Sequence, residues 1–543
     1  MKNMKKAISY IISTAFAVSL LSSCTDAFEG MNTDPYGVSD EELLQDNNYI
    51  GQHFPTLQKA IYYNVGGFGW DFQTIQNLTS DIWSGYMATP SVFLGGRDTQ
   101  TYVLPSAWTD TFWAYMYDDV MINQLKIKEK CEEMGMETYA HFNAINTVLR
   151  VFAMSRVVDE YGPIIYSKYG ETKTGGTYDS AQDAYKLFFE ELTEASSILD
   201  EYSKKDEVAS FANFDMAYEG DLTKWLKLCN TLRLRLALRV VKYDADWAKK
   251  EGEAAIAASQ GLLKSGEGFI VSGFEWMHPL YTCSIEYNDM FISANIKSIL
   301  GGFDDPRLEM FGIAKKDEVL GVRSGIPDLD ILTDKYKAVI SNINVETTTP
   351  GVIMSSAEPY FLLAEAALRG WNTGGGTAKS YYEEGVKASF NEWGVTLGDY
   401  LNSHAVPAYF TDPLADYADD ETVRNLAVQN NIAAASTITP CWDDATSDEE
   451  RLEKIITQKW IAGFPEGKNA WAEWRRTGYP KLFQIRQNNS QGVIPTELGV
   501  RRLPFIQDEV TNNPEGYAQA VQLLGGADNG ATRIFWDVDK SNI

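Results

Sequence analysis

Aromatic side chains alternate with polar ones between residues 62 and 117. Fourteen of these 56 residues are Trp, Tyr or Phe, about twice the frequency in the whole chain. A sugar ring has apolar faces and a polar rim, so an aromatic ring can stack on it while amides, carboxylates and guanidinium groups bond its hydroxyls. The segment therefore predicts a ligand-binding surface, unless its rings pack in the core, the commoner role of any single aromatic residue. Our candidate ligand-binding residues here are Asp81, Trp83, Tyr86, Arg97 and Trp108.

A second candidate segment runs from Phe274 to Tyr287, inside a region with little periodicity. It holds Trp276, His278 and Tyr281. Irregular segments lie at the surface and often carry binding residues. We take Trp276 and Tyr281 as further candidates for ligand contact, with core packing again as the alternative.

Catalytic motifs are missing from the sequence. We find no GxSxG, HExxH or P-loop pattern, and the four histidines are scattered without metal-ligand spacing. An acidic chain offers many carboxylate pairs of the kind that glycoside hydrolases use, and the sequence singles none out. We expect no catalytic residues and no cofactor. Adjacent carboxylates at Asp304-Asp305-Pro306-Arg307 are a weak calcium candidate, but no EF-hand spacing surrounds them, so a solvated turn is favoured.

Charge and cysteine content narrow the function classes. The formal net charge of −28 repels nucleic acid and argues against a basic patch on anionic lipid. Apart from the cysteine at position 24, the cysteines are widely spaced and form no CxxC pair, so they predict neither a zinc site nor a redox motif. Sequence alone leaves open whether disulfides join them: Cys131, Cys229, Cys283 and Cys441.

Helical periodicity supplies the elements that must position these residues. Apolar residues recur at helical spacing in eight segments: 139–161, 180–202, 225–241, 248–263, 355–369, 378–393, 450–464 and 470–477. In the second, Ser180 is the expected N-cap. Residues 264–350 and 402–447 and the C-terminal stretch are expected to be irregular. A single amphipathic pair cannot bury its own face, so we predict a mainly α fold of tetratricopeptide-like helix pairs packed with a loop-rich half.

The N-terminal residues have the features of an export signal. Lys2, Lys5 and Lys6 precede an apolar run from Ile8 to Leu21 that is too short to span a membrane. The stretch from Leu21 to Cys24 is similar to a bacterial lipobox, so we expect lipid on Cys24. Several acyl chains on one residue would hold the protein on a bilayer without a spanning segment. Removing residues 1–23 would move the net charge from −28 to −31.

Several fragments together resemble the SusD/RagB family of outer-membrane nutrient-binding lipoproteins, and they span nearly the whole chain in order. Besides the lipobox, they are Leu149–Phe152, Asp159–Pro163, Trp225 with Asn230–Ala237, Tyr360–Ala366, Gln458–Trp460 and Ala472–Pro480. The last of these is particularly similar to a SusD-like branch distinct from the founding starch-binding member.

The resemblance implies a domain organisation. Residues 1–23 would be the signal peptide, 24–45 an acylated tether and 46–543 a single SusD-like domain. Its helical scaffold would lie mainly in 46–263, 355–400 and 450–485, and its ligand side mainly in 62–117 and 264–350. The charged residues of the family-like motifs are expected to form ion pairs between helices rather than contact ligand: Arg233, Arg235, Glu365, Arg475 and Arg476.

The resemblance also implies a function. The chain would bind a nutrient oligosaccharide at the cell surface and deliver it to a TonB-dependent, SusC-like β-barrel transporter in the outer membrane, to which its lipid anchors it. Two alternatives stay open, a peptide or another nutrient as ligand and, less favoured, a surface glycoside hydrolase. The sequence does not name the glycan.

Overall fold

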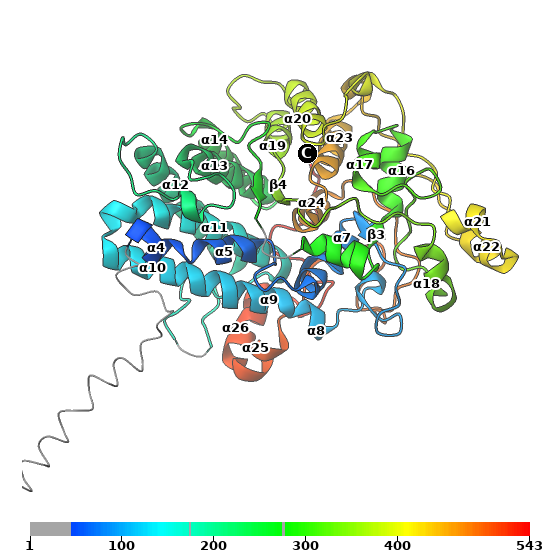
Figure 1. The fold of residues 1–543 in the computed structure, drawn as a ribbon, viewed down its shortest axis with the longest axis horizontal. Helices are drawn as coiled ribbons and strands as arrows, with labels where there is room; N and C mark the ends of the chain where they lie inside the picture. Colours follow the sequence, from blue (N-terminus) through cyan, green and yellow to red (C-terminus); the bar gives the residue numbers. More distant parts are fainter. Residues whose placement is uncertain (1–44, 173–174, 274–276) are drawn as a thin grey trace, which may run out of the picture. The chain divides into compact units, whose positions relative to one another are not determined.

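Long helices that pack against their neighbours along the chain form one side of the fold (Figure 1). The computed structural model describes residues 45–172, 175–273 and 277–543, so Cys24 and Trp276 lie outside the described residues. The helices of this side are α5 (Phe54–Ile61), α10 (Ile122–Met134), α11 (Met136–Tyr161), α12 (Ala181–Tyr202), α13 (Leu222–Arg239), α14 (Ala245–Ala257), α19 (Glu358–Leu368), α20 (Ala378–Glu392), α23 (Asp448–Ala462) and α24 (Gly467–Thr477).

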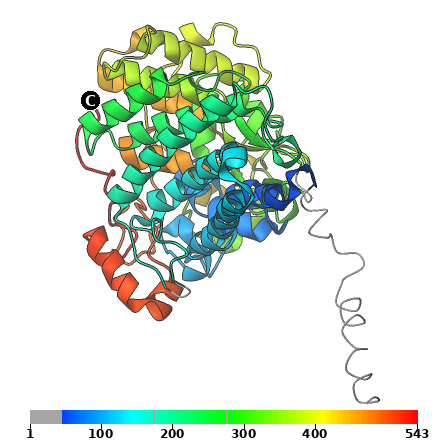
Figure 2. The ribbon, with the colours of Figure 1, turned by 90° about the vertical axis from the view of Figure 1, so that its left-hand side faces the viewer.

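The helix ends follow the capping chemistry of the sequence. Ser180 precedes α12 and its hydroxyl accepts a hydrogen bond from the backbone N–H of Asp183, as predicted. Asp221 caps α13 in the same way, and Thr377 and Ser380 form a capping box at the start of α20. The mainly α class with paired helices is confirmed, and Figure 2 shows the green helices of the first half beside the lime pair α19 and α20.

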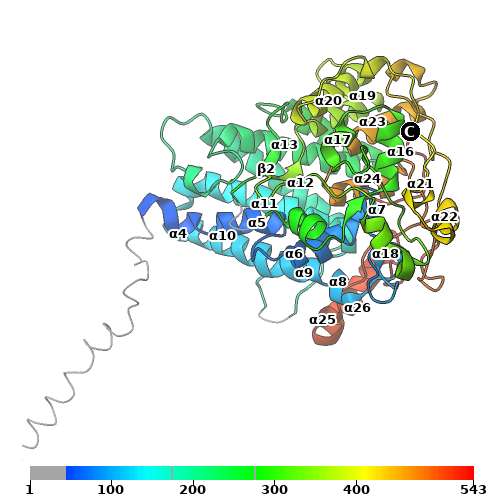
Figure 3. The same ribbon diagram turned by 45° about the vertical axis from the view of Figure 1, so that its right-hand side comes forward.

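Shorter elements form the rest of the fold. They include α6 (Gly69–Phe72), α7 (Ser80–Trp83), α8 (Ser106–Thr109), α9 (Thr111–Tyr115), α15 (Pro279–Tyr281), α16 (Ala294–Gly302), α17 (Arg307–Phe311), α18 (Leu329–Lys337), α21 (Pro413–Tyr417) and α22 (Glu421–Val428). Among them, α16, α18, α21 and α22 lie at the right of Figures 1 and 3. Two small antiparallel sheets join distant segments: β1 (Met87–Ala88) with β3 (Phe291–Ile292), and β2 (Phe269–Val271) with β4 (Gly351–Met354).

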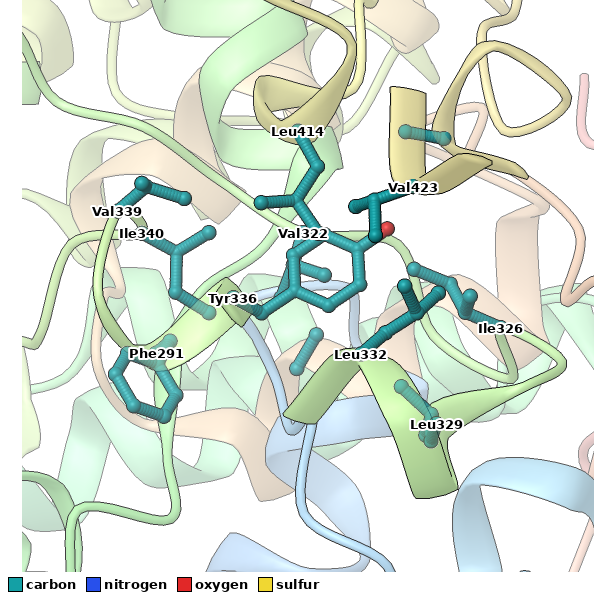
Figure 4. Close-up of a cluster of buried hydrophobic side chains, with 12 residues drawn as sticks. Phe291, Val322, Ile326, Leu329, Leu332, Tyr336, Val339, Ile340, Leu414 and Val423 are labelled. Atoms are coloured by element: carbon teal, nitrogen blue, oxygen red, sulfur yellow. The ribbon is translucent and has the colours of Figure 1, made fainter. Parts of the chain in front are cut away.

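Some helices lie where the sequence predicted irregular structure. α16 and α18 fall within 264–350, α21 and α22 within 402–447, and α25 (Gln507–Asn512) and α26 (Pro514–Leu524) near the C-terminus. Packing stabilises three of them: Tyr336 of α18, Leu414 of α21 and Val423 of α22 meet in one buried cluster (Figure 4). Helices this short depend on tertiary contacts, which a local pattern does not reveal.

Buried ion pairs join the long helices, as the family-like motifs predicted. Arg235 of α13 bonds Glu358 of α19 through two hydrogen bonds of 2.8 and 2.6 Å. Arg476 of α24 pairs with Glu365 of α19 at 2.7 Å, and Arg233 pairs with Glu251 at the boundary of α13 and α14. The prediction is wrong for Arg475, whose guanidinium donates to the carbonyl oxygens of Asp159 and Arg501 instead of a carboxylate.

The Asp304–Arg307 stretch is a turn that is solvated only in part, because Asp304 is exposed whereas Asp305 and Arg307 are buried. Asp305 is buried, and both its carboxylate oxygens accept hydrogen bonds from the guanidinium of Arg307. Arg307 also donates to Ser389 of α20 and to Gln458 of α23. The carboxylate of Asp305 is thus buried together with Arg307, the cation that pairs with it. Both of its oxygens already accept hydrogen bonds from Arg307.

The chain divides into two units, residues 1–50 and 51–543. The described part of the first unit is a 3₁₀ turn, Gln45–Asn47, and the beginning of α4 (Asn48–Gly51). In this turn the amide of Asn48 donates to the carbonyl oxygen of Gln45. All further results concern the second unit.

Candidate functional site

The two candidate segments meet around an open cavity of about 650 Å³. Its lining comes from the turn before and at the start of α6, from the stretch around α15 and from the loop that precedes β4. The lining residues are Gly67, Phe68, Gly69, Gly273, Met277, Thr282, Glu286, Tyr287, Thr347 and Thr348. We refer to this feature as the open cavity.

Exposed aromatic rings stand at the open cavity. Phe68, which lines the cavity, is 57% exposed, and Trp70, which lies beside Phe68 but is not a lining residue, is 52% exposed. Their ring centroids lie 6.2 Å apart with planes inclined by 32°. Tyr287 contributes a third ring, 41% exposed, from the second segment. Single exposed rings are common on protein surfaces, but several exposed rings gathered at one cavity are typical of a binding surface.

Close packing holds the two segments together. A Cβ atom on Gly69 would lie 2.5 Å from the Cγ2 of Thr282, so only glycine fits there. The thiol of Cys283 donates to the carbonyl oxygen of Gly69 at 3.5 Å, and β1 pairs with β3. Each segment also continues into a π-helical turn, at Gln73–Asn77 and at Thr282–Glu286. Such turns are rare and occur often at functional sites.

His278, next to Met277 of the cavity wall, joins Tyr62 and the loop that carries Thr347 to the start of α15. The N–H of Leu280 donates to its Nδ1, so the proton is assigned to Nε2, which lies 2.9 Å from the hydroxyl oxygen of Tyr62. The backbone N–H of His278 donates to the carbonyl oxygen of Thr347. Burial lowers the pKa of His278 to about 3, so the ring is neutral at physiological pH.

The polar groups of the wall are mostly neutral. Thr282, Thr347 and Thr348 offer hydroxyls, and Glu286 is the single carboxylate among the described lining residues. Hydrolysis of a glycosidic bond uses two carboxyl groups on opposite sides of the bond. This wall is suited to stacking and hydrogen bonding of a neutral, ring-containing ligand.

Three predicted site residues lie in the interior. Asp81 accepts hydrogen bonds from the side-chain amides of Gln76 and Asn77, and burial raises its pKa to about 8. Trp83 donates from its indole N–H to the carbonyl oxygen of Thr99. Tyr86, with no exposed surface, donates to the carbonyl oxygen of Trp460. Their polar atoms are already bonded within the protein, so they support the fold here and do not face the open cavity.

The other predicted residues lie near the surface but do not line the open cavity. Trp108 is half-buried on α8, with its ring 5.6 Å from that of Phe93, and Arg97 is exposed in the neighbouring loop. Tyr281 is half-buried at the end of α15, one residue before Thr282 of the cavity wall. Trp276 cannot be placed, because it lies outside the described residues.

The candidate list omitted Phe68, Trp70 and Tyr287, which the structure exposes. Phe68 and Trp70 flank Gly69, and Gly66 and Gly67 precede them. An aromatic residue between glycines has few neighbours of its own to pack against, and this signal could have found the pair.

The described residues show whether the four cysteines form disulfides and whether any helix could span a membrane. Cys131, Cys229, Cys283 and Cys441 are all free thiols. Over the described part of the chain, no helix has the length and apolar character needed to cross a membrane.

Comparison with known proteins identifies the family. Residues 30–537 match the family model described as SusD-like, the SusD and RagB outer-membrane lipoproteins. A chitin-binding SusD homologue from Flavobacterium johnsoniae is 40% identical, with a TM-score of 0.84 over 91% of this chain and 100% of that one. A SusD homologue from Bacteroides vulgatus is 38% identical, with a TM-score of 0.84 over 92% and 99%. One from Bacteroides thetaiotaomicron is 30% identical, with a TM-score of 0.80 over 91% and 99%. No curated protein matched. This chain belongs to the SusD and RagB family of outer-membrane lipoproteins.

Proposed function

We propose that the chain is a cell-surface lipoprotein that binds a nutrient oligosaccharide in the open cavity and passes it to a TonB-dependent, SusC-like transporter. The observation that carries the ligand class is the exposed ring of Phe68, which lines the open cavity together with three threonines and has the exposed ring of Trp70 beside it. Aromatic faces and neutral hydrogen-bonding groups match the two surfaces of a sugar ring.

The relative from Flavobacterium johnsoniae is described as chitin-binding, which makes chitooligosaccharides the first ligands to test. The N-acetyl groups of chitin would add apolar methyls and amides to the same rings and hydroxyls. The lipid on Cys24, surface exposure and the transporter partner are part of the proposal and rest on family membership.

Calorimetry with a panel of neutral oligosaccharides, chitooligosaccharides first, tests the site. Trp70→Ala and Phe68→Ala should each weaken binding at least tenfold, about 1.4 kcal/mol. Tyr409→Ala is the matched control, because Tyr409 is an equally exposed ring (60%) on the segment before α21, which contributes no residue to the open cavity. Equal loss in the control, or unchanged affinity in folded Phe68→Ala, would remove the open cavity as the binding site.

Two further arms separate the alternatives. If the protein binds peptides and none of the oligosaccharides, the proposed ligand class is wrong. The proposed lipid anchor and transporter partner are unaffected by that result. Release of new reducing ends on prolonged incubation with the bound glycan would overturn the proposal of binding without catalysis. Co-purification of the acylated protein with a plug-bearing β-barrel from outer membranes tests delivery.

A further inference from the structure

Three side chains of types that can bind a metal ion, two from one segment and one from another, come together away from the open cavity. One donor atom each from His404, Cys441 and Asp444 lies within 4.8 Å of the other two. A ring nitrogen of His404 is 2.8 Å from a carboxylate oxygen of Asp444. Of the four cysteines that the structure describes, Cys441 alone is not buried. Sequence spacing could not reveal this group, because His404 belongs to a different segment from the other two residues.

The backbone fixes the arrangement. The N–H of Cys441 donates to the carbonyl oxygen of Ser403 at 3.1 Å, which brings the two segments together. A 3₁₀ turn, Trp442–Asp444, follows directly and returns Asp444 toward Cys441. The hydroxyl of Thr439 donates to the carboxylate of Asp444 at 2.6 Å and orients it.

Packing against α20 anchors the same turn. The hydroxyl of Tyr382 donates to the carbonyl oxygen of Pro440 at 2.7 Å. The ring of Trp442 is buried 5.2 Å from that of Tyr382. The three donor groups are therefore mounted on backbone that α20 holds in place, so binding an ion costs little ordering of the chain.

The donor set selects the ion. One sulfur, one imidazole nitrogen and one carboxylate oxygen match zinc, whereas calcium and magnesium prefer sets made of oxygen alone. In a tetrahedral site with zinc bonds of about 2.0–2.3 Å, the donors lie about 3.3–3.8 Å apart. Donors already within 4.8 Å reach that spacing through small side-chain rotations.

We propose that His404, Cys441 and Asp444 bind one Zn²⁺ ion, with water in the fourth position. On binding, the thiol of Cys441 loses its proton to solvent and coordinates as thiolate. In the metal-free chain Nδ1 of His404 faces the carboxylate of Asp444, which only accepts hydrogen bonds, so the ring proton is assigned to Nδ1. On zinc binding this proton exchanges through solvent to Nε2, Nδ1 coordinates through its lone pair, and Asp444 coordinates as a carboxylate. One proton per ion is released.

The ion would close the segment between the two halves of the site. Residues 405–440 leave the site at His404 and return to it at Cys441, and they carry α21 and α22. These helices contribute Leu414, Val423 and Ala427 to the buried cluster that includes α18 (Figure 4). Zinc would brace this segment by fixing the two points where it begins and ends.

The test titrates chelator-treated protein with Zn²⁺ against a colorimetric zinc indicator. We expect one ion per chain, about one proton released per ion in weakly buffered solution, and a higher melting temperature with zinc. Cys441→Ser and His404→Ala should lose the tight site and the thermal shift. With Co²⁺ in place of Zn²⁺, the protein should show thiolate charge-transfer absorption that Cys441→Ser abolishes.

Asp443→Asn is the matched control, because Asp443 is adjacent and exposed but its carboxylate pairs with Lys379 outside the site. It should bind zinc as the unmodified chain does. Melting temperatures without metal show whether each variant is folded. Zinc affinity that is unchanged in folded Cys441→Ser and His404→Ala, or no saturable binding to the unmodified chain, would overturn the proposal.

Discussion

The imidazole Nε2 of His278 lies 2.9 Å from the hydroxyl oxygen of Tyr62, and this contact joins the two segments that wall the open cavity. Tyr62 follows α5 of the helical side, whereas His278 begins α15 in the loop-rich half. The buried imidazole can bond Tyr62 and Leu280 at the same time only while it is neutral, because the N–H of Leu280 needs an unprotonated ring nitrogen as its acceptor. The geometry of the binding surface is thereby linked to the protonation of one histidine.

The first prediction concerns acid sensitivity. Burial lowers the pKa of His278 to about 3 in the folded chain, against about 6.5 when unfolded. The unfolded state therefore binds more protons between these values, and stability falls as pH decreases from about 6.5 toward 3. His278→Asn keeps a capping side chain but cannot titrate, so its urea-unfolding free energy should depend less steeply on pH in this window. Tyr62→Phe, which keeps the histidine, should lose stability without losing the slope; identical slopes for His278→Asn and the unmodified chain would contradict the argument.

The second prediction concerns the packing of Gly69 on Thr282. An added methyl at Gly69 would lie 2.5 Å from the Cγ2 of Thr282 and must push the exposed rings away from the π-helical turn. Gly69→Ala should cost about 1–3 kcal/mol of stability and weaken ligand binding. Gly301→Ala in α16 is the control, because its nearest neighbour would be 3.7 Å away, and it should be neutral or stabilising. Calorimetry and thermal unfolding measure both effects, and equal behaviour of the two variants would refute them.

The helical side of the fold was predictable because its helices are long enough to show their own periodicity. Ser180 capped α12 as expected, and Arg235 and Arg476 paired across helices as the motifs suggested. The short helices of the loop-rich half were not predictable. α18 and α22 bury only a few residues each, and their stability comes from meeting one another.

The candidate site was predictable as two segments but not residue by residue. Aromatic density located both segments, and the structure brings them together at the open cavity. Whether a given ring faces water depends on partners that are distant in the sequence. The ring centroid of Trp83 lies 4.7 Å from that of Trp471, and the ring centroid of Tyr86 lies 5.0 Å from that of Trp460. No pattern within residues 62–117 carries that information, and among the residues that the structure describes no ring from a distant segment covers Phe68 or Trp70.

The third prediction concerns the ion pair between Arg476 and Glu365, both almost fully buried. Arg476 forms two hydrogen bonds of 2.7 Å to Glu365 and a third, of 2.6 Å, to Glu473. Arg476→Met leaves these buried carboxylates short of a cation and should cost about 3–5 kcal/mol in urea unfolding. Arg451→Ala breaks an exposed pair with Asp448 and should change stability by less than about 1 kcal/mol. Similar losses in the two variants would show that the buried pair is replaceable.

The fourth prediction concerns Asp81, which packs against Gly467 and the start of α24. Burial, together with the nearby charge of Glu466, raises the pKa of Asp81 to about 8, although hydrogen bonds from Asn77 and Gln76 lower it. An unfolded aspartate titrates near 3.9. Between these values the folded state holds the extra proton, so stability contributed by protonated Asp81 is lost as pH rises from about 4 through 8.

Asp81→Asn removes this titration while preserving the size of the side chain and one acceptor for the two amides. A constant offset in unfolding free energy from the changed hydrogen bonds is expected at all pH values. On top of that offset, the variant should gain stability relative to the unmodified chain between pH 5 and pH 8.5, measured by urea unfolding at several pH values. A difference between the two proteins that stays constant across the range would mean that Asp81 is ionised in the folded chain. In that case its hydrogen bonds from Gln76 and Asn77 would outweigh the cost of burying its charge.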